Sequence, residues 1–188
     1  MPDAKTLFLV AHIFGVALGA GGAFMSDAMF MSAVRDSRFS KTEIRFLKLA
    51  SVLIWSGLTL LVLSGIGIFS TDPERYMASS KFLAKMTIVG VIVLNGFVFH
   101  FWHLPLIHRH TGVHFPTSDE FMHKRVWILV SGAVSALSWS SALVLGSLSS
   151  VPLSYGAIMG LYGGCITVAI GGALLLRDKL LPRGKRNT

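Results

Sequence analysis

The sequence predicts an all-α protein, a polytopic membrane helix bundle with five transmembrane helices. Hydrophobic residues make up 53% of the 188 residues and charged residues only 14%, whereas soluble domains carry about 25% charged residues. Several apolar stretches reach the roughly 20 residues that a helix needs to cross a bilayer. These stretches are continuous rather than short and alternating, which excludes a membrane β-barrel. Backbone groups in lipid must bond internally, so the stretches are expected to be helices.

Five stretches are long and apolar enough to be spans. They are Leu7–Met31, Ala50–Phe69, Phe82–Trp102, Val126–Leu148 and Tyr155–Leu176. The first is expected to be a retained helix, because its apolar stretch exceeds the roughly 7–15 residues of a signal-peptide core. Little of the chain lies outside the spans, so residues 1–188 are expected to form one transmembrane helical bundle domain.

The basic residues predict the orientation of the bundle. Thirteen of the seventeen Lys and Arg follow the first, third and fifth spans, and the net charge is +8. Basic loops favour the cytoplasmic side. The N-terminus is therefore expected outside and the C-terminus in the cytoplasm, in the inner membrane of a bacterial cell. The basic excess then reflects topology and contact with anionic lipid rather than nucleic-acid binding.

Two segments between the spans carry local signals. Asp72-Pro73, in the loop after the second span, indicates a break or a helix start. The longest inner loop is expected between Pro105 and Pro116, and Ser118 followed by Glu120 suggests an N-cap for the fourth span.

Two polar residues are expected at the same depth near the outer face. His12 lies about five residues inside the first span, roughly 7–8 Å, and Lys85 lies about three residues inside the third, roughly 5 Å. Ionisable residues within spans are candidates for function. The alternatives are that Lys85 snorkels to the interface and that His12 is a hydrogen-bonded core residue.

A second polar group is expected near the inner face. His103 follows Lys85 by eighteen residues, five helical turns, and so lies on the same stripe roughly 27 Å away. His100 and Asn95 lie close to this stripe, and Asp27 on the first span lies at a depth comparable with His100 and His103. These three ionisable residues are candidates for a proton or quinone site, or for hydrated interfacial side chains.

Small residues mark two helix faces. His12 is followed on its stripe by Gly15, Gly19, Gly22 and Ser26, a face that could admit a flat macrocycle or another helix. Gly15-x3-Gly19-x3-Ala23 and Gly156-x3-Gly160-x3-Gly164 permit close helix approach. They predict packing within one bundle or the seam of a homo-oligomer.

Other metal-binding side chains give weaker indications. His108, His110, His114 and His123 are expected in the inner loop and could form a metal site, since imidazole binds Zn, Cu, Fe and Ni alike. Met25 and Met29 lie one turn apart, and thioethers favour Cu(I), although such a pair is also common in helix packing. Cys165 is the single cysteine, so no disulfide framework and no thiol metal site are expected.

Three segments carry a resemblance to known families. They read "AHIFGVALGAGGAF", "RFLKLASVLIWSGLTLLVLSGIGIF" and "KMTIVGVIVLNGFVFHFWHLPLI". Together, over about residues 7–107, they resemble the small bacterial inner-membrane proteins grouped around the copper-resistance D family. They resemble more distantly the membrane-bound, oxygen-independent protoporphyrinogen oxidases. In the latter family a first-helix histidine and a third-helix lysine are implicated in haem b binding, and His12 and Lys85 fall on those positions.

These observations leave three functions open. The first is a b-type haem-binding redox protein, in which His12 is an axial ligand and Lys85 is the second ligand or a propionate partner. Such a protein would transfer electrons or act as an oxidoreductase on a porphyrinogen or a quinone. The second is a permease for copper or another metal ion, and the third is a non-catalytic membrane subunit or scaffold. Nucleophile triads and phosphate loops are absent from the sequence.

Overall fold

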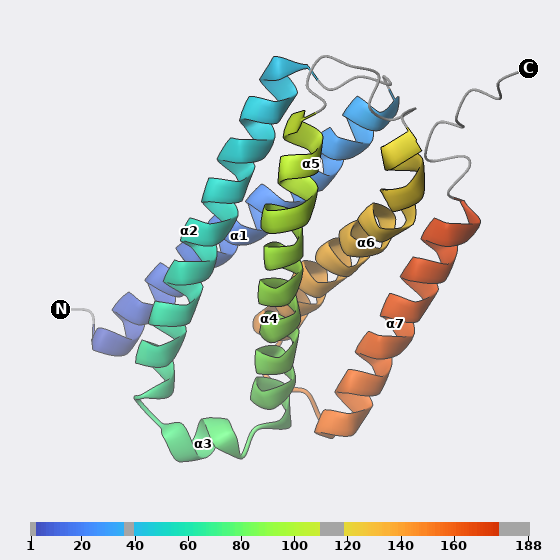
Figure 1. Ribbon diagram of the computed structural model, residues 1–188. Helices are drawn as coiled ribbons and strands as arrows, with labels where there is room; N and C mark the ends of the chain where they lie inside the picture. Colours follow the sequence, from blue (N-terminus) through green and yellow to red (C-terminus); the bar gives the residue numbers. More distant parts are fainter. Residues whose placement is uncertain (1–2, 36–39, 110–118, 177–188) are drawn as a thin grey trace, which may run out of the picture.

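The computed structural model describes residues 3–35, 40–109 and 119–176, and these are helical apart from short connections (Figure 1). The helices, in chain order, are α1 (Ala4–Arg35), α2 (Lys41–Phe69), α3 (Pro73–Met77), α4 (Ser80–Val98), the π-helical turn η1 (Phe99–His103), α5 (Leu104–Arg109), α6 (Asp119–Ser147) and α7 (Tyr155–Leu175). Within the described residues the structure is therefore all-α, as predicted.

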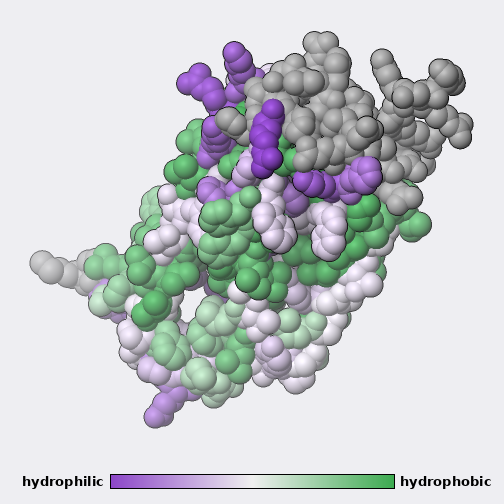
Figure 2. Space-filling model, in the orientation of Figure 1, coloured by the Kyte–Doolittle hydropathy of each residue, from purple (hydrophilic) through white to green (hydrophobic). Residues whose placement is uncertain are grey.

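Five helices are long and apolar enough to cross a membrane. They cover Ala4–Ala33, Lys41–Phe69, Ser80–Ile107, Val126–Ser147 and Tyr155–Leu175, which correspond one to one with the predicted spans. Apolar side chains on their surface point outward: Val168 is 76% exposed and Leu94 is 68% exposed. Figure 2 shows hydrophilic residues gathered at the upper end and a few at the lower end, with mainly hydrophobic surface between them. The surface is thus that of a multi-pass membrane protein.

Side-chain caps set several of the helix starts. Ser40 and Glu43 form a reciprocal capping box at the start of α2, and Asp72 caps α3 with Pro73 at its first position. The helix start predicted at Asp72-Pro73 is therefore confirmed. The suggested cap Ser118 and the loop residue Pro116 lie outside the described residues.

The third span is longer than predicted and is not uniformly α-helical. The prediction that Pro105 bounds the inner loop was wrong, because the helix continues through Pro105 to Arg109. An α-helix would direct the carbonyl four residues earlier into the proline ring. The π turn η1 ends at His103, two residues before that proline, and the Leu104 N–H bonds to the Phe99 carbonyl oxygen. The 3.6-residue count therefore does not continue to His103, and the predicted single α-helical stripe from Lys85 to His103 is interrupted.

The closest helix contact joins α1 and α2. A Cβ atom added at Gly15 would lie 2.9 Å from the Gly57 carbonyl oxygen, and one added at Gly57 would lie 2.7 Å from the Gly15 carbonyl oxygen. One added at Gly22 would lie 3.2 Å from the Ala50 carbonyl oxygen. The small-residue face of α1 thus receives another helix and does not form an open slot for a macrocycle.

The remaining helices form a second group, in which α6 packs against both α4 and α7. Tyr162 on α7 shares a 2.7 Å hydrogen bond with Ser138 on α6, and Thr87 on α4 shares a 3.1 Å bond with Tyr155. By contrast, a Cβ atom added at Gly156, Gly160 or Gly164 would have no described atom within 4 Å. The glycine face of α7 is therefore not used inside the described bundle.

The α1–α2 contact generates a prediction about stability. We expect Gly57→Leu to lower the unfolding temperature of the detergent-solubilised protein, because overpacking a tight contact typically costs about 1–3 kcal/mol. The matched control is Gly160→Leu on α7, where the added side chain meets open space. Equal unfolding temperatures for the two variants would contradict this packing.

Candidate functional site

The two polar residues predicted near one end of the bundle meet in the structure. Nε2 of His12 on α1 lies 3.3 Å from Nζ of Lys85 on α4, and both side chains are partly buried. The prediction that they lie at the same depth is confirmed. This contact spans the boundary between the α1–α2 pair and the α4–α6–α7 group.

Ser64 on α2 sets the tautomer of the His12 ring. Its Oγ atom lies 3.0 Å from Nδ1 of His12, and its hydroxyl donates to the Leu60 carbonyl oxygen at 2.5 Å. A hydroxyl has one proton to donate, so Ser64 accepts from the Nδ1–H of His12. The lone pair of a neutral His12 is then on Nε2, the atom that faces Lys85. An oxygen acceptor on one ring nitrogen is the usual way in which a metal-binding histidine is oriented.

Small residues and a second lysine complete this site. A Cβ atom at Gly65 would lie 3.7 Å from Cε1 of His12, and one at Gly146 would lie 3.8 Å from Nζ of Lys85. Lys81, one turn before Lys85, donates to the Leu148 carbonyl oxygen after the end of α6. Lys81 therefore bonds to a carbonyl group at the C-terminal end of a helix, where a positive charge is favourable. Lys85 faces the imidazole of His12 instead.

The second predicted group is divided between two places. Nδ1 of His100 lies 3.1 Å from Oγ of Ser51 on α2, and its ring contacts Trp55 and Phe101 edge-on. Together with Phe97, these residues line a shallow groove between α2 and the third span. His103, in contrast, points into the bundle and is only 7% exposed. The π turn allows two histidines three residues apart to face different surroundings.

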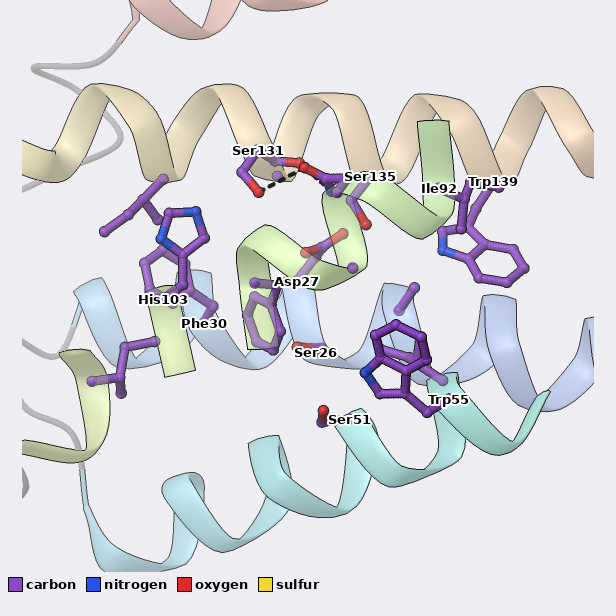
Figure 3. A pocket seen from close by; sticks show the side chains of 18 residues that line it. Ser26, Asp27, Phe30, Ser51, Trp55, Ile92, His103, Ser131, Ser135 and Trp139 are labelled. Atoms are coloured by element: carbon purple, nitrogen blue, oxygen red, sulfur yellow. Dashed lines mark hydrogen bonds between the residues drawn. The ribbon is translucent and has the colours of Figure 1, made fainter. Parts of the chain in front are cut away.

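Asp27 and His103 line the same internal cavity, which is shown in Figure 3 and has a volume of about 60 Å³. Asp27 enters from α1 and lies against Ser135 of α6. Among the described residues, Oδ2 of Asp27 and Nε2 of His103 are the two buried side-chain polar atoms without a hydrogen-bond partner. Asp27 and His103, which were predicted at a comparable depth, therefore line one cavity.

Asn95, a half-buried polar residue on the third span, already has hydrogen-bond partners. Its Nδ2 donates to the Ser131 carbonyl oxygen at 3.1 Å, and its Oδ1 accepts from the Ser131 hydroxyl at 2.9 Å. This reciprocal pair joins α4 to α6, and both residues line the cavity.

The weaker metal candidates do not converge within the described residues. His110 and His114 lie outside them, as does the side chain of His108, and His123 is exposed at the start of α6. Met25 is 56% exposed, whereas Met29 packs against the core beside Phe30. In the part of the chain that the structure describes, no group of three or more His, Cys, Asp or Glu is positioned to hold a metal ion.

Sequence reasoning did not identify the serines that complete these sites. They are Ser51, Ser64 and Ser135. Serine is common in membrane helices because it can bond to the carbonyl group one turn back, so its presence alone carries little information. The one available signal was the Ser64-Gly65 pair in the second segment of the family resemblance.

Comparisons of the chain with models of protein families, with characterised proteins and with solved structures find no match. The functional proposals therefore depend on the sequence resemblance and on the geometry of these side chains.

Proposed function

We propose that this protein is a b-type haem-binding membrane redox protein, with His12 as an axial ligand. Lys85 is the second axial ligand, or it pairs as an ammonium group with a haem propionate. The observation that supports this proposal best is the orientation of the His12 ring: Ser64 accepts from Nδ1, and Nε2 is directed at Lys85. Neutral imidazole and amine nitrogen both bind iron, and histidine is the common haem ligand.

The donor set fits haem iron, and the present spacing sets a condition on binding. The two nitrogen atoms lie 3.3 Å apart, in direct contact, so haem between them requires α1 and α4 to separate locally. The helix packing is compatible with such a movement, because α1 packs mainly on α2 whereas α4 packs mainly on α6. Haem beside the pair, with Lys85 on a propionate, requires less movement.

Haem bound here would supply one-electron redox chemistry, whose potential depends on axial ligands and burial. The protein residues would have four tasks. His12 would bind the haem iron, Ser64 would hold the imidazole in the metal-binding tautomer, and the surrounding apolar helices would exclude water. Lys85 either donates its amine lone pair or contributes a positive charge. The electron partner in this proposal is a porphyrinogen, as the family resemblance implies, or a quinone.

The proposal predicts a haem spectrum that depends on both residues. Protein expressed with a haem supply and purified in detergent should show a Soret band and, after dithionite reduction, an α-band. His12→Ala and Lys85→Ala should each lose or shift these bands, because each removes a group that holds the haem. His123→Ala, an exposed histidine outside the site, should leave the spectrum unchanged.

A colourless wild-type protein under these conditions would overturn the haem proposal. Metal-dependent activity without haem absorbance would then favour the permease. The absence of both haem absorbance and metal-dependent activity would favour a scaffold. Soret and α-bands that are unchanged in both variants would mean that the haem binds elsewhere.

Ser64 provides a second, graded prediction. Ser64→Ala removes the acceptor for Nδ1–H of His12 while leaving both proposed ligands in place. Loss of such a supporting hydrogen bond typically lowers metal affinity about 10–100-fold. Haem titration of the apoprotein should therefore give a higher Kd for Ser64→Ala than for Ser56→Ala, a control on an exposed serine of the same helix. Equal Kd values would contradict the orienting role of Ser64.

We also propose that the chain lies in a bacterial inner membrane with its N-terminus outside, since the basic residues are concentrated on the other side. Single-cysteine variants in a Cys165→Ser background test this. Arg75→Cys, in α3, should react with a membrane-impermeant maleimide on intact spheroplasts. Arg45→Cys, an exposed position near the start of α2, should react only after lysis. The reverse pattern would mean the opposite orientation.

A further inference from the structure

The cavity around Asp27 and His103 contains polar atoms that need a partner. Oδ2 of Asp27 and Nε2 of His103 are buried without a hydrogen bond, and His103 is more than nine-tenths buried. A buried polar group without a partner costs about 1–3 kcal/mol. The cavity volume of about 60 Å³ is sufficient for a few water molecules, each of which needs roughly 10–15 Å³ by this measure.

The lining of the cavity indicates the kind of occupant. Beside the carboxyl group and the imidazole it includes the hydroxyl groups of Ser26, Ser51 and Ser135, all of which exchange protons with water. Among the described residues that line the cavity, none is a lysine or an arginine. Lys124, near the start of α6, is exposed. Charge inside a bilayer is costly, and burying even an ion pair costs desolvation. A protonated carboxyl group beside a neutral imidazole avoids both costs.

We propose that this cavity is a hydrated proton-transfer site in which Asp27 and His103 exchange one proton through bound water. In the transfer, the O–H bond of the Asp27 carboxyl group breaks and an N–H bond forms at Nε2 of His103. The intervening water accepts one proton and releases another. The neutral pair becomes an ion pair, and no electron moves. The proposal does not depend on haem at His12.

A route from the cavity to the membrane-facing surface is also present. Ser51 lines the cavity and contacts Nδ1 of His100 at 3.1 Å. His100 in turn lines the groove formed with Trp55, Phe97 and Phe101, and Phe97 and Phe101 are exposed on the bundle surface. The cavity that Asp27, His103 and Ser51 line is thus connected, through Ser51 and His100, with the lipid-facing side of the bundle. Both histidines belong to the π turn, a type of distortion that is frequent at functional sites.

Infrared spectroscopy of the protein in lipid nanodiscs tests the proposal directly. A carboxylic acid that is protonated at neutral pH gives a carbonyl-stretch band, and the proposal predicts that this band comes from Asp27. Labelling aspartate with a heavy carbon isotope in its carboxyl group should shift this band without any substitution. Asp27→Asn should abolish the band, and Asp72→Asn, in an exposed loop, should leave it unchanged.

Two further measurements distinguish a hydrated proton site from other occupants. Exchange into heavy water should shift the band because bound water reaches the carboxyl group, and His103→Gln should shift it because the proton acceptor is removed. Absence of the band would overturn the proposal, as would a band that neither heavy water nor His103→Gln changes. Saturable loss of the band when sodium chloride replaces choline chloride would identify a cation site instead.

Folding of the variants is checked by their elution volume and unfolding temperature. If Asp27→Asn does not fold, the isotope shift in the wild-type protein still identifies the band as that of an aspartate. Ser135→Ala, which removes the hydroxyl beside the intact carboxyl group, should then shift the band. An unchanged band in that variant would place the protonated aspartate outside the cavity.

Discussion

The close approach of α1 and α2 is the contact on which the positions of the polar side chains depend. Gly15 and Gly57 bring the two backbones together, and a side chain at either position would meet the other helix. Lipid supplies no hydrophobic drive for helices to associate, so small residues and the resulting van der Waals contacts supply the attraction. With α2 held at this distance, Ser64 reaches His12, which lies one turn before Gly15 on α1.

The boundary between the α1–α2 pair and the α4–α6–α7 group carries both polar sites. The contact between His12 and Lys85 crosses it at one end, and the cavity between Asp27 and His103 crosses it toward the other. Measured hydrogen bonds between membrane helices are worth roughly 0.6 to 2 kcal/mol each. Such groups add modestly to stability, and their main effect is to select one arrangement of the helices, because any other would leave them unpaired in hydrocarbon.

The two sites differ in a way that separates their proposed roles. His12 and Lys85 contact each other directly, whereas Asp27 and His103 leave two atoms facing a cavity. His12 and Asp27 are fifteen residues apart on α1, about 22 Å along the helix axis, so the sites do not touch. Trp139 lies between them, because it lines the cavity and also faces Gly19. Communication between the sites would therefore pass through packed side chains.

The sequence by itself determined the number of spans, the helix start at Asp72-Pro73 and the shared depth of His12 and Lys85. These follow from length, hydropathy and the helical rise, which act along one segment at a time. The tertiary structure decided which face each polar residue uses. In it, α2 packs on the glycine face of α1, and Ser64 accepts a hydrogen bond from His12. The π turn before Pro105 directs His100 and His103 to different surroundings. Those outcomes depend on which helices are neighbours, and spacing within one helix does not specify its neighbours.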